Sequence, residues 1–222
     1  MDKNNWESDV LGIREHYRSK IEKRGGVSAA SLDWRNSEKQ ETVFYNAIAD
    51  LSGKFKTVFD VGCGSGDLYR YMTNNGFDID GYHGIDIVPE FVEYGTKNKV
   101  PNLQVGNFLS SKNEDKYDLV INLGGLNSKT SFYEQYLIMN ISKMIKISKK
   151  YVVFNLITKA SDSYFPNQNQ SRVGHITSIT NEQFTKIIKK IKKSYPNIRY
   201  QKKNVAIFPG SIDTFVRITV CD

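Results

Sequence analysis

A glycine-rich segment has the residue types and spacing of a ligand-binding turn. Gly62, Gly64 and Gly66 alternate directly after the mainly apolar segment 57–61 and before a helical pattern that starts at Leu68. Glycine adopts a positive φ easily and lets a ligand approach the backbone more closely than a Cβ would allow. A buried strand that runs through such a turn into a helix is typical of a site for a nucleotide-like cofactor.

The residue that follows the turn argues against a dinucleotide. A G-x-G-x-x-G fingerprint requires a glycine at position 67, where this chain has Asp67, and a carboxylate there would repel a pyrophosphate. What remains is an acid, Asp60, two residues before the alternating glycines. This pattern resembles motif I of the class I S-adenosylmethionine-dependent methyltransferases. The resemblance implies S-adenosyl-L-methionine as cofactor, contacted by Asp60, Gly62, Cys63 and Gly64.

A second acid, Asp86, ends the next predicted strand. Ligands of doubly wound sheets bind beyond the carboxyl ends of the strands, so Asp86 should lie near the glycine turn. A carboxylate at this place can accept hydrogen bonds from both ribose hydroxyls of an adenosine, and Ile87 would contact the adenine ring. The alternative is that Asp86 caps the helix that begins near Pro89.

Four further cofactor contacts follow from the resemblance. Asn107 stands where the family usually has an aspartate that accepts from the adenine amino group, and an amide oxygen can also accept that bond. Phe108 either stacks on adenine or fills the core. Asn122 and Leu123 end the fourth predicted strand, where they would face the methionine part of the cofactor.

Trp34 belongs to a segment that resembles part of the cofactor site in some bacterial members of the family. Those proteins have a tryptophan, then a glutamine and an arginine before motif I. Trp34 and Gln40 match, whereas Val43 stands in place of the arginine. Trp34 is therefore expected either to contact the cofactor or to anchor the N-terminal segment.

The acceptor of the methyl group is less well marked. The fourth strand is followed by Gly124 and Gly125 instead of the Asn/Asp-Pro-Pro-Tyr motif of enzymes that methylate amino groups of adenine or glutamine, which disfavours those substrates. We expect transfer to an oxygen, nitrogen or carbon of a small molecule, mainly by positioning for in-line attack. The predicted acceptor-binding residues are Asn127, Tyr133 and Tyr164, and His175 is the candidate general base if it is not merely exposed.

The elements that would position these residues alternate between strand and helix after residue 55. Strands are predicted at 57–61, 82–87, 103–105, 117–123, 151–154, 198–208 and 214–220, with capping boxes at Ser37, Ser131 and Thr180 opening three of the helices. The expected fold is a doubly wound α/β sheet of seven strands, mostly parallel, with helices on both faces and one antiparallel edge strand. Residues 1–55 are expected to form a helical cap on the same domain as the methyltransferase region 56–222.

Composition limits the other functions. The 222 residues are 39% hydrophobic, without a run long enough to cross a membrane and without a signal peptide, so a cytoplasmic location is expected. Two cysteines cannot form a zinc site by spacing, and no metal is predicted. The net charge of +7 keeps an RNA methyltransferase possible, although the lysines of 186–193 lie opposite an apolar helix stripe and are explained by solvation. A protein that binds the cofactor without transferring methyl, or that uses its aminocarboxypropyl group, also stays open, and the sequence does not indicate the oligomeric state.

Overall fold

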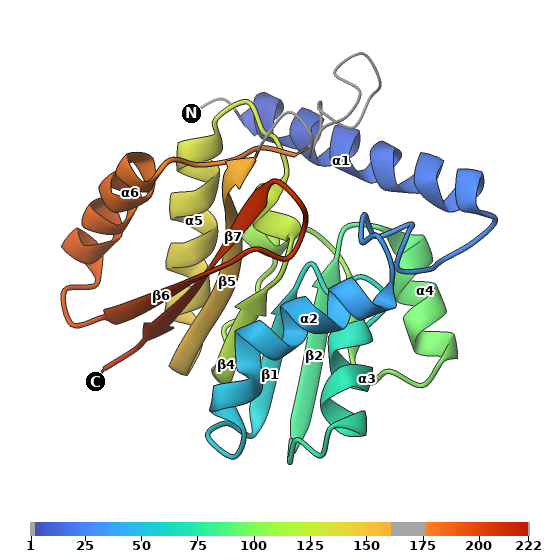
Figure 1. Cartoon of the computed structure of the whole chain (residues 1–222), viewed down its shortest axis with the longest axis horizontal. Helices are drawn as coiled ribbons and strands as arrows, with labels where there is room; N and C mark the ends of the chain where they lie inside the picture. The colour runs from blue at the N-terminus through green and yellow to red at the C-terminus, as the bar shows by residue number, and fades with distance from the viewer. Residues whose placement is uncertain (1–2, 161–175, 222) are drawn as a thin grey trace. The chain divides into compact units, whose positions relative to one another are not determined.

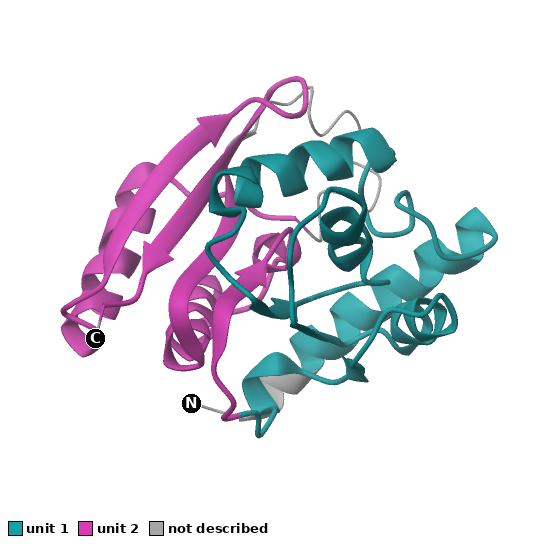
Figure 2. Ribbon diagram, turned by 90° about the horizontal axis from the view of Figure 1, so that it is seen from below, with its two compact units in different colours: residues 1–113 teal, residues 114–222 magenta. Residues whose placement is uncertain are grey.

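The computed structural model describes residues 3–160 and 176–221 (Figure 1). His175 and Tyr164 lie outside these residues. The chain forms two compact units, Met1–Asn113 and Glu114–Asp222 (Figure 2).

The first unit contains the predicted N-terminal helices and the first three strands. Its elements are α1 (Lys3–Arg24), α2 (Ser37–Ile48), η1 (Ala49–Leu51), β1 (Thr57–Val61), α3 (Asp67–Asn74), β2 (Gly81–Asp86), α4 (Pro89–Lys97), β3 (Leu103–Val105) and η2 (Phe108–Ser110). β2 pairs in parallel with β1 on one side and with β3 on the other. β1 is buried from Val58 onward, which explains why all of these residues except Asp60 are apolar.

The described residues of the second unit form four strands and two α-helices. Its elements are β4 (Tyr117–Asn122), η3 (Gly125–Asn127), α5 (Tyr133–Lys146), β5 (Ser148–Ala160), α6 (Asn181–Ser194), β6 (Arg199–Val205) and β7 (Ser211–Thr219). β4 pairs in parallel with β5, whereas β7 pairs antiparallel with both β5 and β6. All six residues of β4 are buried, as the apolar run 119–121 at its centre predicts.

The hydrogen-bonded strands form a seven-stranded sheet in the order β3-β2-β1-β4-β5-β7-β6. This order confirms the predicted α/β fold with a mostly parallel sheet. The antiparallel strand is β7, which lies next to the outermost strand β6. The predicted division into a cap at 1–55 and a domain at 56–222 stays a prediction.

One of the three predicted capping boxes is confirmed. Thr180 and Gln183 exchange side-chain and backbone hydrogen bonds at the start of α6. The box at Ser131 is wrong, because α5 begins at Tyr133 after an N-cap, Phe132, that makes no side-chain bond. The box at Ser37 is also wrong, since Asn36 caps α2 through the N–H of Lys39.

The lysine-rich helix α6 is amphipathic, as predicted. Phe184, Ile187, Ile188 and Ile191 are buried along one side of it. Within the same unit, Lys186 and Lys190 pair with Glu134 of α5. Among the described helices, none has both the length and the apolar character that crossing a membrane requires.

Candidate functional site

The glycine turn curls over the carboxyl end of β2. The N–H groups of Gly62 and Cys63 both donate to the carbonyl of Ile85, at 2.8 and 3.2 Å. Gly62, Gly64 and Gly66 have φ angles of 71°, 55° and 77°. Each of these three positions therefore requires a left-handed conformation that residues with a Cβ rarely adopt.

Close packing adds a second reason for glycine at two of these positions. A Cβ on Gly64 would lie 2.7 Å from Cδ2 of Leu32, and a Cβ on Gly66 would lie 2.5 Å from Cγ1 of Val100. Leu32 precedes α2, so the segment before that helix covers the turn. The fold itself thus requires these glycines, whatever ligand the turn binds.

Asp86 lies against the glycine turn, as its position at the end of β2 predicts. Its Oδ2 accepts the N–H of Gly64 at 2.8 Å, and its Oδ1 accepts the N–H of Val88 at 2.9 Å. Burial raises the pKa of the Asp86 carboxyl to about 6, against the opposing effect of these backbone N–H donors. Each carboxylate oxygen keeps further lone-pair capacity for a ligand hydroxyl.

Asp60 accepts a hydrogen bond from Tyr82, a partner that the sequence does not indicate. The hydroxyl of Tyr82, on β2, donates to Oδ2 of Asp60 at 2.6 Å. Both residues are buried, and burial raises the pKa of Asp60 to about 7 although the Tyr82 bond opposes the shift. Asp86 and Asp67 raise it further by charge repulsion.

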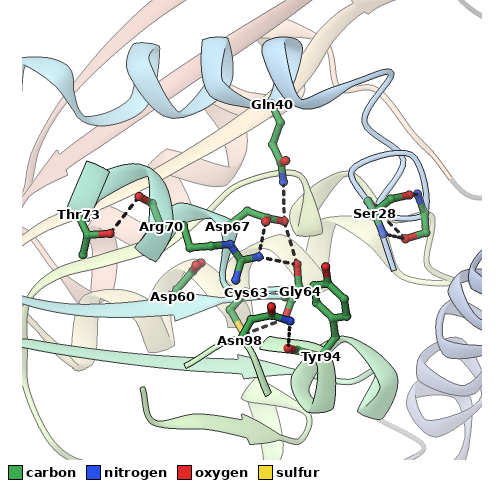
Figure 3. A network of polar contacts seen from close by, with 12 residues as sticks. Ser28, Gln40, Asp60, Cys63, Gly64, Asp67, Arg70, Thr73, Tyr94 and Asn98 are labelled. Atoms are coloured by element: carbon green, nitrogen blue, oxygen red, sulfur yellow. Dashed lines mark hydrogen bonds and ion pairs between the residues drawn. The ribbon is translucent and has the colours of Figure 1, made fainter. Parts of the chain in front are cut away.

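Asp67, which follows the turn, is the centre of a polar network (Figure 3). Nη2 of Arg70 donates to Oδ1 of Asp67 at 2.5 Å, and the hydroxyl of Ser65 donates to its Oδ2 at 3.0 Å. Nε2 of Gln40, on α2, donates to the same Oδ2 at 3.2 Å. The network ties the helix before the sheet to the first residue of α3.

The other predicted cofactor residues of this unit lie in different surroundings. Asn107 uses its Oδ1 to accept the N–H of Leu109, so it caps η2. Phe108 is 5% exposed and packs against Phe59, with ring centroids 5.8 Å apart. Trp34 and Ile87 are half-buried. The structure thus gives Phe108 a core position, and its contact with adenine stays a prediction.

The predicted residues after β4 hold a tight turn in the second unit. Oδ1 of Asn122 accepts the N–H of Leu126 at 3.1 Å, and the hydroxyl of Tyr133 donates to the carbonyl of Leu126 at 2.9 Å. Oδ1 of Asn127 accepts the N–H of Ile157 at 2.9 Å. Leu123 is 9% exposed. These polar atoms of Asn122, Asn127 and Tyr133 order the 124–127 turn, and a role in acceptor binding stays a prediction.

A buried pair that the sequence alone does not indicate lies beside that turn. Nδ2 of Asn155, on β5, donates to Oδ1 of Asp213 on β7 at 3.0 Å, and Oδ1 of Asn155 accepts the N–H of Gly124 at 2.8 Å. Asp213 is 3% exposed, and its Oδ2 has no hydrogen-bond partner among the described residues. Burial raises the pKa of Asp213 to about 6. The sequence signal for this pair is Asp213 itself, an acid that stands between Ile212 and the strand predicted at 214–220.

Comparison with known proteins identifies the family. A family model described as a methyltransferase domain matches residues 52–206, well over half of the chain. No curated protein matches the sequence.

Several solved structures share the fold. Magnesium protoporphyrin IX methyltransferase from Synechocystis PCC 6803 with bound SAH is 16% identical, with a TM-score of 0.64 over 95% of this chain and 99% of that chain. The plantazolicin methyltransferase BpumL in complex with SAH is 15% identical, with a TM-score of 0.64 over 94% of each chain. A possible histamine N-methyltransferase from Thermotoga maritima is 14% identical, with a TM-score of 0.57 over 82% of this chain and 89% of that chain.

At these identities the structural likeness concerns the fold, whereas the family model concerns the sequence itself. Both agree with the glycine turn and with the strand order of the sheet. The chain therefore belongs to the methyltransferase domain family.

Proposed function

We propose that the protein is an S-adenosyl-L-methionine-dependent methyltransferase that acts on a small-molecule acceptor. The observation that carries this proposal is the 2.8 Å bond from the Gly64 N–H to the Asp86 carboxylate. It joins the glycine turn to an acid at the carboxyl end of the neighbouring strand, where a doubly wound sheet binds an adenosine. Membership of the methyltransferase family supports the same cofactor.

The charges around the glycine turn fit this cofactor better than a dinucleotide. Asp60, Asp67 and Asp86 are all acids, and the first and last are buried. Their mutual repulsion contributes to the raised pKa of Asp60. A sulfonium cation would be attracted to such a site, whereas a pyrophosphate would be repelled.

In the proposed complex, Asp86 accepts hydrogen bonds from the ribose hydroxyls, and the backbone of 62–64 adjoins the rest of the nucleoside. Ile87, Asn107 and Phe108 are proposed for the adenine, Asn122 and Leu123 for the methionine part, and Trp34 for the edge of the site. The bound cofactor supplies a methyl group that its sulfonium already activates. The protein then contributes mainly orientation, which can lower a barrier by several kcal/mol.

The acceptor is proposed as a small molecule held by Asn127 and Tyr133, with Tyr164 and His175 as predictions outside the described residues. Related folds support a small or peptide-derived acceptor, since those proteins are described as methyltransferases of magnesium protoporphyrin IX and of plantazolicin. We also propose a cytoplasmic location and a cap formed by residues 1–55.

Calorimetry tests the cofactor site. The protein should bind S-adenosylmethionine and S-adenosylhomocysteine, and Asp86→Ala should weaken both by at least about tenfold, since a charged acceptor for two hydroxyls is lost. Asp78→Ala is a matched control, because it removes an exposed carboxylate that pairs with Lys56. An unchanged affinity in Asp86→Ala would remove the ribose assignment.

Mass spectrometry of reaction mixtures tests the reaction. Candidate acceptors incubated with the protein and S-adenosylmethionine should release S-adenosylhomocysteine and gain one methyl group. Release of methylthioadenosine would instead indicate aminocarboxypropyl transfer. Binding of the cofactor without any product across a broad acceptor panel would favour a binding protein.

A further inference from the structure

The N-terminal helix α1 contacts the connection between β2 and α4. Nε of Arg14 donates to the carbonyl of Ile87 at 2.9 Å, and Nε of Arg18 donates to Oε1 of Glu90 at 2.8 Å. Between them in sequence, Tyr17 meets Phe91 edge to face, with ring centroids 5.8 Å apart. Positions 14, 17 and 18 share one face of a helix, so a single face of α1 makes all three contacts.

A different side of α1 holds the segment before α2. Nε2 of His16 lies 3.0 Å from Oδ2 of Asp33, and Nζ of Lys20 pairs with the other oxygen of the same carboxylate. Asp33 has a φ of 68°, a left-handed conformation that aspartate tolerates better than most residues. The segment that includes Asp33 also carries Leu32, whose side chain packs over Gly64. α1 is therefore connected to both parts of the proposed adenosine site.

The hydrogen bond from Arg14 is made to the residue that directly follows Asp86. Ile87 follows Asp86 directly, and the next residue, Val88, donates its N–H to Oδ1 of Asp86. The peptide groups on either side of Ile87 thus set where the Asp86 carboxylate is held. Arg14 fixes the carbonyl of this residue from outside the sheet, over a separation of 73 residues in sequence.

We infer that Arg14 is a positioning residue for the cofactor: it orients the 86–88 connection so that Asp86 and Ile87 can bind the adenosine. This inference rests on the proposed function. α1 is then part of the cofactor site through the backbone, without a direct contact of Arg14 with the ligand. The ligand class that Arg14 affects is any molecule with an adenosine half.

The test is calorimetry of the whole chain with S-adenosylhomocysteine and with adenosine. Arg14→Ala should raise the Kd of both ligands by a similar factor, about tenfold, because the disturbed contacts are those of the adenosine. Arg14→Lys should recover most of the affinity, since an ammonium can still donate to the Ile87 carbonyl. Arg24→Ala is the matched control, an exposed arginine in the last turn of the same helix, and should bind like the wild type.

The outcomes separate this inference from the proposed function. If the wild type binds neither ligand, the proposed function fails. If the wild type binds and Arg14→Ala binds equally well, the positioning role fails. If Arg14→Ala is unfolded in a thermal scan, the folded variants Arg14→Lys and Arg14→Gln are compared instead. Affinity close to that of the wild type in Arg14→Lys, together with weaker binding in Arg14→Gln, supports the positioning role. Equal affinity of the two variants overturns it.

Discussion

Gln40 and Asp67 are joined by a 3.2 Å hydrogen bond from the amide Nε2 to the carboxylate Oδ2. Gln40 is 6% exposed on α2, and Asp67 is the first residue of α3. The bond connects the helix that precedes the sheet to the helix that follows the glycine turn. Its strength should therefore be visible in the stability of the first unit.

Gln40→Ala should lower the free energy of unfolding by about 1 kcal/mol, because Arg70 and Ser65 still satisfy Asp67. Gln40→Glu should lower it more, since a second carboxylate would face Asp67 in a half-buried site. Urea denaturation measures both, with the exposed neighbour Glu41→Ala as control. Equal stability of the alanine and glutamate variants would contradict the assigned bond.

The raised pKa of Asp86 predicts that cofactor binding depends on pH. Only the ionised carboxylate can accept from both ribose hydroxyls, and with a pKa of about 6 roughly a tenth of it is ionised at pH 5. The Kd for S-adenosylhomocysteine should therefore rise about tenfold between pH 8 and pH 5. Asp60, with a pKa of about 7, titrates nearby, so Asp60→Asn should keep this dependence if Asp86 causes it.

The raised pKa of Asp86 also predicts that the free energy of unfolding of the ligand-free protein falls as the pH rises. The folded pKa of Asp86 lies above its ordinary value of 3.8, so its contribution to stability is present at low pH and is lost as the pH rises through about 6. Cofactor binding should therefore strengthen over the same pH range in which the contribution of Asp86 to the stability of the folded protein weakens. Parallel slopes for binding and for unfolding would contradict the assignment.

Gly64→Ala should destabilise the protein by about 2 kcal/mol, because it combines a positive φ with a Cβ 2.7 Å from Leu32. Gly53→Ala separates the two causes, since Gly53 has a φ of 73° and nothing within 4 Å of an added Cβ. We expect about 1 kcal/mol there. Adding Leu32→Ala should relieve the contact part at position 64, measured as a double-mutant cycle, and a purely additive cycle would refute the contact.

Asp213→Asn should stabilise the protein at pH 8 and change little at pH 4. The folded pKa of about 6 exceeds the ordinary 3.8, so the native state loses stability as the pH rises, by up to about 3 kcal/mol. The amide keeps the bond from Asn155 without a buried charge. Thermal unfolding at the two pH values measures the effect, and Asp118→Asn is the control because that carboxylate pairs with Lys150.

Local patterns in the sequence predict the bounds of three strands to within one residue. β1 and β3 begin and end at the predicted residues, and β4 is one residue shorter than predicted. β5 extends over Ser148–Ala160, well beyond the run 151–154 that the sequence predicts. Its added part includes Asn155, whose partner Asp213 lies 58 residues later, so no local period could indicate it.

In the candidate site too, general rules predict some contacts, whereas contacts between segments far apart in the sequence are not predicted. The approach of Asp86 to the glycine turn followed from a general rule about strand ends, and the bond to Gly64 agrees with it. The hydroxyl of Tyr82 on Asp60 and the guanidinium of Arg14 on Ile87 depend on packing between distant segments. The failed capping box at Ser37 shows that a short motif does not fix a helix start when a neighbouring residue, here Asn36, serves as N-cap.

The position of β7 between β5 and β6 has a consequence for synthesis on the ribosome. Within the second unit, β4 and β5 can pair as soon as both have left the exit tunnel. Among the described strands, β6 pairs with β7 alone, and β7 is translated after it. The basic edge strand must therefore wait unpaired in the nascent chain, and its lysines at 202 and 203 would discourage association with other chains during that interval.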